Sequence, residues 1–288
     1  MIKKGIILAG GYGTRMSPLT KAVNKQLLPI YDKPLIYYPL SVLMLAGIKN
    51  ILLVVNKGQR QQFKNLLQDG ARFGIKINYI EQEKPKGLPD AFILGEKFIG
   101  KDNIALILGD NFFFGQSLTK KLKNCLTLNS GCKILVHPVS KPELYGVATT
   151  NKKNKIVSIR EKPRNSKSNL AITGLYFFDN KVVEFTKKLK PSKRGELEII
   201  DLLNIYKSQK GLKAELIGRG GSWLDTGNIK DFYNATNFVS AIENRQGLKI
   251  ACIEEIALKK GWIGIKKVQE AIKFYGNCEY SAYLKNLI

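Results

Sequence analysis

Short apolar runs alternate with amphipathic segments over the first 110 residues, and this pattern constrains the fold more than any other feature of the chain. The runs are nearly free of polar residues, which is typical of strands buried on both faces of a sheet. We predict strands over Gly5–Ala9, Asn50–Val55, Lys76–Ile80 and Ile104–Gly109, with helices over Leu35–Ala46, Gln59–Leu67 and Leu88–Phe98 between them. Strand–helix alternation predicts parallel βαβ units, and therefore an α/β protein with a mostly parallel central sheet flanked by helices.

The remaining residues divide into a mixed-strand middle and a helical end. In the middle we predict strands over Lys133–Val139, Gly146–Thr150, Ile156–Arg160 and Ile172–Phe178, with a turn at Asn151–Asn154. In the last third we predict helices over Asn228–Asn244, Ile253–Lys259, Ile263–Phe274 and Tyr280–Leu287. No linker separates independent domains, so we expect one Rossmann-like unit over residues 1–288. Its last part should be a helical layer, either an accessory layer or a contact between subunits.

The net charge of +24 is high for a chain of 288 residues, and it raises the possibility of a nucleic-acid partner. The basic residues, however, are dispersed along the whole sequence in short groups such as Lys120–Lys123, Lys187–Lys188 and Lys266–Lys267. A dedicated basic arm would concentrate them. We therefore favour a solvated surface that also attracts anionic substrates, and keep a basic nucleic-acid-binding protein as the alternative from another class.

Cysteine and histidine usage excludes several kinds of site. The cysteines Cys125, Cys132, Cys252 and Cys278 show no C-x-x-C spacing, which argues against a zinc site. The sequence has one histidine, His137, in an apolar strand, so histidine metal clusters and Ser–His hydrolysis are disfavoured. No apolar run reaches the roughly 20 residues of a membrane-spanning helix. We expect a cytoplasmic protein without a membrane partner.

A glycine-rich turn, Gly10–Arg15, follows the first predicted strand directly. Glycines let the backbone turn tightly and direct several N–H groups at one point, which favours an anion site. A dinucleotide fingerprint is excluded because Met16 stands where its third glycine would be, and a P-loop is excluded because Gly-Lys-Ser/Thr is absent. A structural turn remains possible when the segment is considered alone.

Two aspartates stand where strands or turns end. Asp110 follows the apolar strand Ile104–Leu108 after one glycine, and Asp225 lies in the turn-like segment Trp223–Gly227. A charge at the end of a buried strand needs a partner. Taken alone, each aspartate could equally cap a turn.

A series of ordered motifs resembles the sugar nucleotidyltransferases, and specifically the glucose-1-phosphate thymidylyltransferase family. The resemblance covers nearly the whole chain and is carried by Gly10–Arg15, Lys25–Pro29, Asp32–Pro34, Gln82, Gly87–Leu88, Leu108–Asn111, Tyr145–Val147, Glu161–Pro163, Thr173–Tyr176, Arg194–Ile199 and Trp223–Gly227. It implies transfer of a thymidylyl group from dTTP to glucose 1-phosphate, giving dTDP-glucose and pyrophosphate for dTDP-rhamnose-type synthesis. A transferase that uses UTP or CTP is the alternative within the class, and a catalytically silent homologue is a third.

The resemblance also implies a role for individual residues. Those that hold the nucleotide are Gly10, Gly11, Gly13, Thr14, Arg15 and Lys25 at the triphosphate, Gln82 and Gly87 at the base with Gln26 close by, and Asp110 through the metal. Those that hold the sugar phosphate are Gly146, Glu161, Lys162, Ile172 and Arg194. Asp110 and Asp225 are the implied Mg²⁺ ligands, and Arg15, Lys162 and the two aspartates are the implied catalytic residues. On this basis residues 1–115 bind nucleotide, 116–227 bind sugar phosphate, and 228–288 form the helical accessory part.

The implied reaction needs no general base, because a phosphate monoester with a second pKa near about 6 is mostly ready to attack at neutral pH. The obstacle is repulsion between two anions, so the site must supply cations and hold the reactants in line.

Two departures affect the implied nucleotide pocket. Tyr12 stands where the family usually has a small residue, and Asp90 adds a negative charge near the base site. The family is commonly a homotetramer with feedback by dTDP-rhamnose, and Gly115, Arg219 and Lys249–Cys252 lie in the segments matching that regulatory site.

Overall fold

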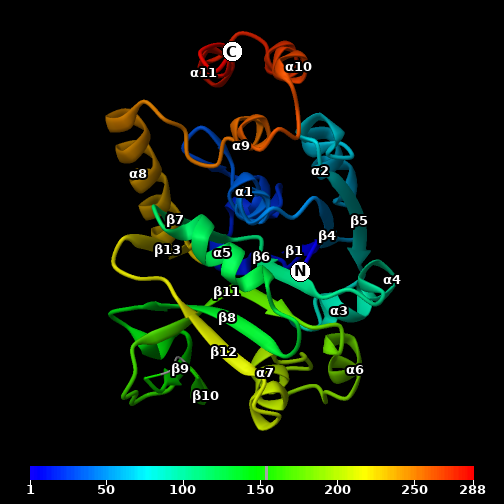
Figure 1. Cartoon of the computed structure of the whole chain (residues 1–288), viewed down its shortest axis with the longest axis vertical. Helices are drawn as coiled ribbons and strands as arrows, with labels where there is room; N and C mark the ends of the chain where they lie inside the picture. Colours follow the sequence, from blue (N-terminus) through cyan, green and yellow to red (C-terminus); the bar gives the residue numbers. More distant parts are fainter. Residues whose placement is uncertain (153–154) are drawn as a thin grey trace.

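The computed structural model describes residues 1–152 and 155–288, and its centre is a nine-stranded sheet (Figure 1). The N-terminal half of the sheet is parallel, in the order β5–β4–β1–β6, with β1 spanning Lys4–Ala9, β4 Asn50–Asn56, β5 Lys76–Gln82 and β6 Ile104–Leu108. The four strands predicted for this region are thus confirmed. Their carboxyl ends meet at one edge of the sheet, with β1 between β4 and β6.

The second half of the sheet is mixed, as predicted. It consists of β8 Cys132–Pro138, β9 Gly146–Thr150, β10 Ile156–Glu161, β11 Leu170–Phe178 and β12 Leu212–Leu216. β11 runs antiparallel to β6 and joins the two halves, whereas β12 adds a parallel edge beside β8. β9 and β10 form an antiparallel pair, so the predicted turn between them is correct at Asn151 and Lys152, while residues 153 and 154 lie outside the described residues.

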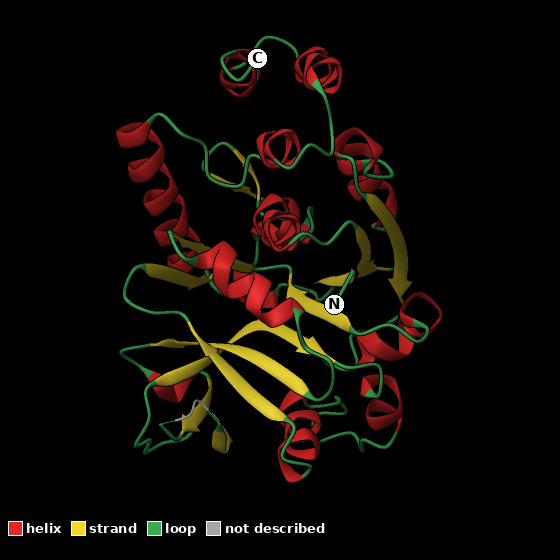
Figure 2. Cartoon of the chain, viewed as in Figure 1, coloured by secondary structure: helices red, strands yellow, loops and turns green. Residues whose placement is uncertain are grey.

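Helices cover both faces of the sheet (Figure 2). Successive strand residues point to opposite sides, so the apolar strands present a hydrophobic surface on each face. Ile7 and Ile107 face one core, together with α1 Tyr37–Ala46, α2 Arg60–Leu67 and α5 Leu118–Leu126. Ile6 and Leu106 face the other, together with α3 Asp90–Leu94, α6 Val182–Lys187 and α7 Ile199–Ser208. The arrangement is that of a doubly wound α/β fold.

The single helix predicted over Leu88–Phe98 is wrong. Gly95 ends α3, and a separate short helix, α4, follows over Glu96–Ile99. The reason is close packing on the sheet: a Cβ at Gly95 would lie 3.1 Å from a Leu52 methyl group and 2.9 Å from the Ala91 carbonyl oxygen.

The C-terminal helices are α8 Ile229–Gln246, α9 Ile253–Lys259, α10 Ile265–Tyr275 and α11 Glu279–Lys285. All four predicted helices are confirmed, and α10 and α11 pack on each other at the end of the molecule away from β9 and β10 (Figure 1). α8 packs on the two-stranded ribbon of β7 Asn111–Gly115 and β13 Gly221–Asp225. Asp225 therefore ends a strand, and its prediction as part of a turn is corrected. A two-residue pair, β2 Pro29–Ile30 with β3 Lys33–Pro34, lies beside α8.

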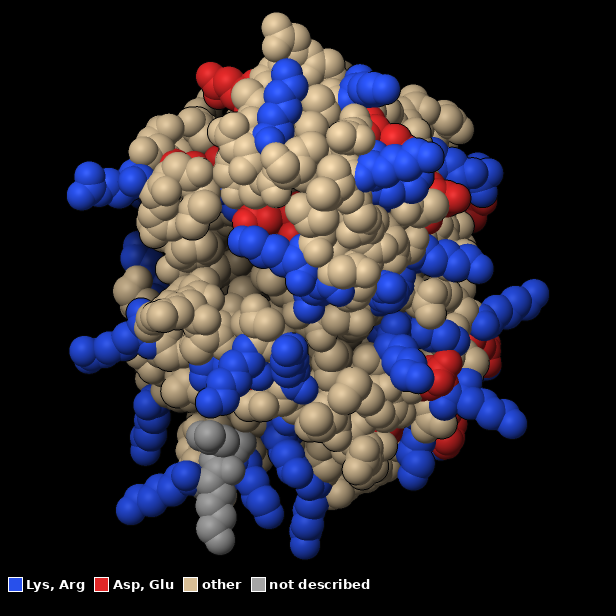
Figure 3. All heavy atoms as spheres, turned by 45° about the horizontal axis from the view of Figure 1, so that its top comes forward, with Lys and Arg blue, Asp and Glu red and all other residues tan. Residues whose placement is uncertain are grey.

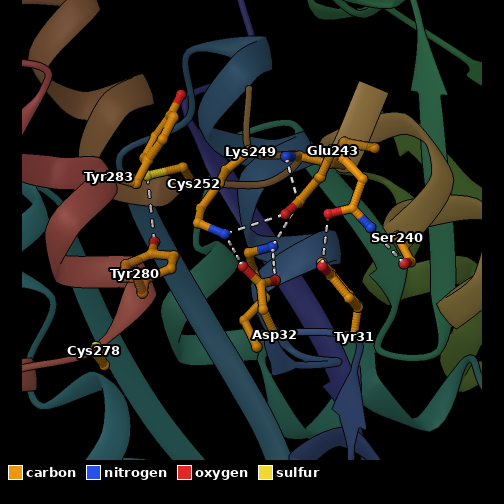
Figure 4. A network of polar contacts seen from close by, with 12 residues as sticks. Tyr31, Asp32, Ser240, Glu243, Lys249, Cys252, Cys278, Tyr280 and Tyr283 are labelled. Atoms are coloured by element: carbon orange, nitrogen blue, oxygen red, sulfur yellow. Dashed lines mark hydrogen bonds and ion pairs between the residues drawn. The ribbon is translucent and has the colours of Figure 1, made fainter. Parts of the chain in front are cut away.

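A buried cluster of charges connects the C-terminal helices to the loop at Asp32 (Figure 4). Lys33 donates to Glu243 at 2.9 Å and pairs with Asp32, and Lys249 pairs with the same two carboxylates. Lys33 and Glu243 are only 3% and 6% exposed. Burial alone would raise the pKa of Asp32, but the two lysines hold it below its ordinary value. The cluster therefore fixes the start of the segment that follows α8.

We predict that Glu243→Ala lowers the free energy of unfolding by about 3–5 kcal/mol, because it leaves the largely buried Lys33 and Lys249 to share the single carboxylate of Asp32. The measurement is denaturant unfolding, with Glu270→Ala as the control. Glu270 pairs with Lys267 on the surface, where both side chains are about half exposed, so its loss should change the free energy of unfolding far less than the loss of Glu243. Equal losses in the two variants would show that the cluster does not anchor the C-terminal part.

Candidate active site

A cavity of about 230 Å³ lies at the edge where β1 and β6 end. This is the position at which open α/β sheets bind ligands, since neighbouring parallel strands there connect in opposite directions. The residues that line it come from four separate segments: Gly10, Gly11, Gly13, Thr14, Arg15, Lys25, Gln26, Asp110 and Gly227. The structure thus brings together most of the residues predicted to hold the triphosphate.

The glycine turn is held in place from both sides. Asn56, at the end of β4, donates to the Gly11 carbonyl oxygen and accepts from the Gly11 N–H, both at 2.9 Å. Met16 is fully buried in the cluster beneath α8, and Thr20 donates to the Gly13 carbonyl oxygen at 2.8 Å. Gly11 has a φ of 108°, a conformation that L side chains rarely adopt.

The backbone amides of this turn are not all available to a ligand. The Gly11 N–H is already bonded to Asn56, so the predicted anion site is one amide smaller than expected. In the part of the chain that the structure describes, the N–H groups of residues 12–15 have no partner. They adjoin the Arg15 side chain, which makes the loop suitable for binding phosphate oxygens.

The second wall of the cavity comes from a short 3₁₀ turn at Lys25–Leu27. Asn24 caps this turn by accepting from the Gln26 N–H at 2.8 Å and donates to the Ala9 carbonyl oxygen, which joins the turn to β1. Lys25 and Gln26 are consequently buried, at 7% and 4% exposure. The Gln26 side-chain oxygen is buried without a hydrogen-bond partner in the described chain. Such an unpaired acceptor is costly, and a ligand donor at the cavity would satisfy it.

Asp110 lies opposite this turn and is fixed by three residues. Lys25 donates to one carboxylate oxygen at 2.7 Å, and the Asn111 amide donates to the other at 3.0 Å. The Asp110 carbonyl oxygen accepts from the backbone and the hydroxyl of Thr226. Burial alone would raise the pKa of Asp110, but Lys25 and these hydrogen bonds hold it below its ordinary value. Asp110 is therefore charged at neutral pH.

Asp225 is brought to the same place by the β7–β13 ribbon, in which it pairs with Asn111. A Cβ at Gly227 would lie 3.0 Å from an Asp225 carboxylate oxygen and 3.1 Å from an Arg15 guanidinium nitrogen, so both groups flank this glycine. Burial and the neighbouring Asp110 charge raise the pKa of Asp225 to about 6. Two half-buried carboxylates thus repel each other in a site that also contains Arg15 and Lys25.

A separate cavity of about 430 Å³ contains most of the predicted sugar-phosphate residues, including Glu161, Lys162 and Arg194. Gly146 pairs with Glu161 across β9 and β10, and a Cβ at Gly146 would lie 3.2 Å from a Glu161 carboxylate oxygen and 3.7 Å from Ile172. Burial raises the pKa of Glu161, against the nearby charge of Lys162. Arg194 pairs through one nitrogen with both oxygens of Glu198, at 2.9 Å each.

Lys162 does not line the cavity at the glycine turn, although the two cavities are connected through packed residues. The Lys162 N–H donates to the Tyr145 carbonyl oxygen at 3.0 Å, and the Tyr145 ring packs on Trp223, two residues before Asp225. The Trp223 ring nitrogen donates to Asn111. A continuous chain of contacts therefore leads from Lys162 to the carboxylates.

The predicted base-binding residues lie on the side of the glycine turn that faces β5. Gln82, at the end of β5, is 5% exposed and donates to Asn56 at 3.0 Å. Gly87 packs against residue 197, whose backbone oxygen would lie 2.1 Å from a Cβ at this position. Asp90 is buried, and burial raises its pKa despite the charge of Lys86. The Tyr12 side chain is 62% exposed and does not line the cavity, so its ring lies outside the phosphate site.

We predict that Gly10→Ala raises the KM for nucleotide by about tenfold while the fold is retained. The φ of Gly10 suits alanine, but the new Cβ would lie 1.9 Å from the Gln82 side-chain nitrogen, so Gln82 must leave its place beside Asn56. A lost hydrogen bond to a ligand is worth about 1–1.5 kcal/mol, or roughly tenfold. The measurement is steady-state kinetics. Gly218→Ala is the control, because nothing lies within 4 Å of its Cβ position, and an unchanged KM in both variants would contradict the assignment.

The two carboxylates provide a donor set that fits Mg²⁺. The ion is commonly held by one or two carboxylates plus substrate phosphates, and a cation here would relieve the repulsion that raises the pKa of Asp225. Among the described residues no group of three or more His, Cys, Asp or Glu could hold a metal by itself. The donor set is thus suited to an ion that shares its coordination with a substrate.

Fold and site together define a class: an α/β protein that binds phosphate-rich ligands at the ends of its parallel strands. Comparison with known proteins narrows this class. Residues 4–242 match the nucleotidyl transferase family. The solved UDP-glucose pyrophosphorylase with bound UDP-glucose has a similar structure, with a TM-score of 0.74 and 29% identity, covering 85% of this chain and all of that one.

Full-length relatives are more specific. Glucose-1-phosphate thymidylyltransferase of Neisseria meningitidis is 51% identical over 285 residues, covering 99% of each chain. The enzyme of the same name from Mycobacterium tuberculosis is 44% identical over 285 residues, again covering 99% of each. The chain therefore belongs to the glucose-1-phosphate thymidylyltransferases, within the nucleotidyl transferase family. The predicted family, fold class and enzyme class are confirmed.

Sequence reasoning missed three residues that organise the site. Asn56 fixes the glycine turn, and Asn111 and Thr226 fix Asp110. The signal for Asn56 was available, since it is a polar residue directly after a predicted buried strand. Asn111 and Thr226 stand within the motifs Leu108–Asn111 and Trp223–Gly227, but nothing in the sequence marks Thr226 as the partner of Asp110, which is 116 residues away.

Proposed function

We propose that this enzyme transfers a thymidylyl group from dTTP to glucose 1-phosphate, giving dTDP-glucose and pyrophosphate. The observation that carries the proposal is the cavity in which Arg15, Lys25 and the free amides of the glycine turn surround the Asp110 carboxylate. The substrates are inferred from the relatives, which are glucose-1-phosphate thymidylyltransferases.

The proposed roles follow from charge. The glycine turn and Arg15 bind the triphosphate, and Lys25 contributes a buried positive charge beside the α-phosphate. Asp110 and Asp225 are the proposed ligands of Mg²⁺, which when bound would neutralise phosphate charge. Gln82 and Gly87 are the proposed contacts of the base, together with Gln26, whose side-chain oxygen is unpaired in the described chain. Each cation lowers the repulsion that opposes the approach of one phosphate to another.

The sugar phosphate is assigned to the second cavity. Gly146 leaves room beside Glu161 and Ile172 for a sugar ring, and the carboxylate of Glu161 can accept hydroxyl hydrogen bonds. Lys162 and Arg194 are the proposed phosphate ligands, and for this role Arg194 must exchange its pairing with Glu198 for the substrate. The phosphate oxygen then attacks the α-phosphorus in line and pyrophosphate leaves, with no covalent enzyme intermediate.

The division of the chain into parts follows the two cavities. Residues 1–115 supply most of the nucleotide cavity and residues 116–227 the sugar cavity, although Gly227 and Asp225 complete the first. Residues 228–288 form the helical part. In the described chain no helix is both long and apolar enough to cross a membrane. We place the enzyme in the cytoplasm, where its nucleotide substrates are found.

Assembly and regulation are further parts of the proposal. Gly115 and Lys249–Cys252 line one cavity of about 340 Å³, while Arg219 is not among its lining residues. By analogy with the family we propose a homotetramer in which dTDP-rhamnose binds near this cavity as a feedback inhibitor. A nucleic-acid partner is not favoured, because lysines and arginines are spread over the visible face instead of forming one stripe (Figure 3).

The test is a pyrophosphate-release assay with glucose 1-phosphate, Mg²⁺ and each of dTTP, UTP, CTP and ATP. The proposal predicts the highest kcat/KM with dTTP. A higher value with UTP or CTP would identify the alternative transferase, and no release with any nucleotide would favour a silent homologue.

A further inference from the structure

A cavity of about 650 Å³ lies away from both cavities assigned above. Its walls come from the β9–β10 pair and from the segment that follows Glu161. The lining residues are Pro142, Val147, Thr149, Ser158, Arg160, Arg164, Asn165, Ser166 and Lys167. Three of them are cations, and none is an acid.

The three cations lack counterions. Within residues 1–152 and 155–288, Arg160, Arg164 and Lys167 form no ion pair and no side-chain hydrogen bond. The sugar cavity differs, because there Arg194 is neutralised by Glu198 and Glu161 lies beside Lys162. Positive charge concentrated in a concave site and left uncompensated attracts anions more strongly than the same charges spread over a convex surface.

The register of β9 and β10 places this cavity on the opposite face of the strand pair from the sugar cavity. Gly146 pairs with Glu161 and faces α7, where its Cβ position lies 3.2 Å from Ile200. The next pair, Val147 with Arg160, points to the other side, since successive strand residues alternate. Thr149 pairs with Ser158 on that same side, so two hydroxyl groups stand beside the Arg160 side chain.

The donors suit a diphosphate. The cavity provides three positive charges, from two guanidinium groups and one ammonium group. Each guanidinium group can bind phosphate through two N–H groups. A single phosphate group carries at most about two negative charges and leaves one cation unmatched. The Thr149 and Ser158 hydroxyls, which have no side-chain hydrogen-bond partner among the described residues, can donate to the remaining oxygens.

We propose that this cavity is a second anion site that binds a diphosphate group, either free pyrophosphate or the diphosphate of a nucleotide. The site is separate from the catalytic cavities and does not depend on the identity of the sugar or base that the enzyme transfers. The segments that line it also carry Gly146 and Glu161, so an occupant contacts the same strand pair as the sugar cavity from its other face.

Calorimetric titration of the full-length enzyme with pyrophosphate tests the proposal. We expect two pyrophosphates per chain, one at the catalytic cavity and one here. In the double variant Arg160→Gln/Arg164→Gln we expect one, or a second site at least tenfold weaker. Lys266→Gln/Lys273→Gln removes the same charge from exposed positions of α10 and should keep both sites. Unfolding curves of the double variants and of a Lys167→Gln single variant exclude loss of fold as the cause of weaker binding.

Two results would overturn the proposal: one pyrophosphate per wild-type chain, or equal weakening in the cavity variant and the α10 variant, which would indicate diffuse charge attraction. Parallel titrations with thymidine diphosphate and orthophosphate distinguish the source of the ligand. Tighter binding of thymidine diphosphate at the second site identifies a nucleotide, and tighter binding of pyrophosphate identifies the free anion. Orthophosphate binding as tightly as either would contradict a diphosphate site.

Discussion

Replacing Arg15 with alanine is expected to lower kcat by roughly 10²–10³, which corresponds to about 2.7–4 kcal/mol of lost transition-state stabilisation. The guanidinium group lines the cavity of the glycine turn, and one of its nitrogens would lie 3.1 Å from a Cβ on Gly227. The turn that carries Arg15 is anchored because the next residue, Met16, is fully buried. A cation placed in advance stabilises charge on the phosphates without having to reorganise during the reaction.

The measurement is steady-state pyrophosphate release with saturating nucleotide and sugar phosphate. Lys21→Ala is the matched control, since Lys21 is an exposed cation of the same loop that does not line the cavity, and its kcat should change less than twofold. Arg15→Lys should recover part of the activity because it restores the charge without the planar fork. A kcat within tenfold of wild type for Arg15→Ala would remove Arg15 from the catalytic residues.

The second large effect concerns the two carboxylates. Asp110→Asn and Asp225→Asn are each expected to raise the Mg²⁺ concentration for half-maximal activity by on the order of 10–100-fold, the range typical of weakened metal sites. The backbone contacts of both residues, from Thr226 to the Asp110 carbonyl oxygen and from Asn111 to Asp225, do not involve the carboxylates, so an amide of the same shape keeps them. The substitution therefore removes charge rather than structure.

Mg²⁺ titration of activity tests this prediction. Calorimetry follows Mg²⁺ binding to the enzyme–nucleotide complex separately. Asp102→Asn is the control, because Asp102 is 58% exposed and pairs with Lys4 far from the cavity. An unchanged metal titration in both carboxylate variants would remove Asp110 and Asp225 as ligands.

The parallel half of the fold could be predicted because its signals are local. Strands buried on both faces have few polar residues, so β1, β4, β5 and β6 stand out from the helices between them. β7 and β13 could not be predicted in this way. They pair over about 100 residues of sequence, and each is short and partly exposed, so only the partner shows that either is a strand.

The same distinction applies to the site. The glycine turn, Lys25 and Asp110 follow recognisable elements, and the structure brings them together at one cavity. Asp225 reaches that cavity only through the β7–β13 pairing, and Lys162 lies in a neighbouring cavity instead of the same one. Which charges are already paired, as Arg194 is with Glu198, depends on side-chain geometry that no motif encodes.

The central claim is that the nucleotide and a carboxylate-bound cation meet at the edge of the sheet where β1 and β6 end. A crystal structure with a non-hydrolysable dTTP analogue and Mn²⁺ in place of Mg²⁺ tests it directly, since anomalous scattering locates the metal independently of the ligand. We expect the triphosphate on the glycine turn beside Arg15 and Lys25, with a Mn²⁺ peak within about 2.3 Å of carboxylate oxygens of both Asp110 and Asp225. A metal peak away from these two aspartates, or a triphosphate bound elsewhere on the chain, would contradict the account.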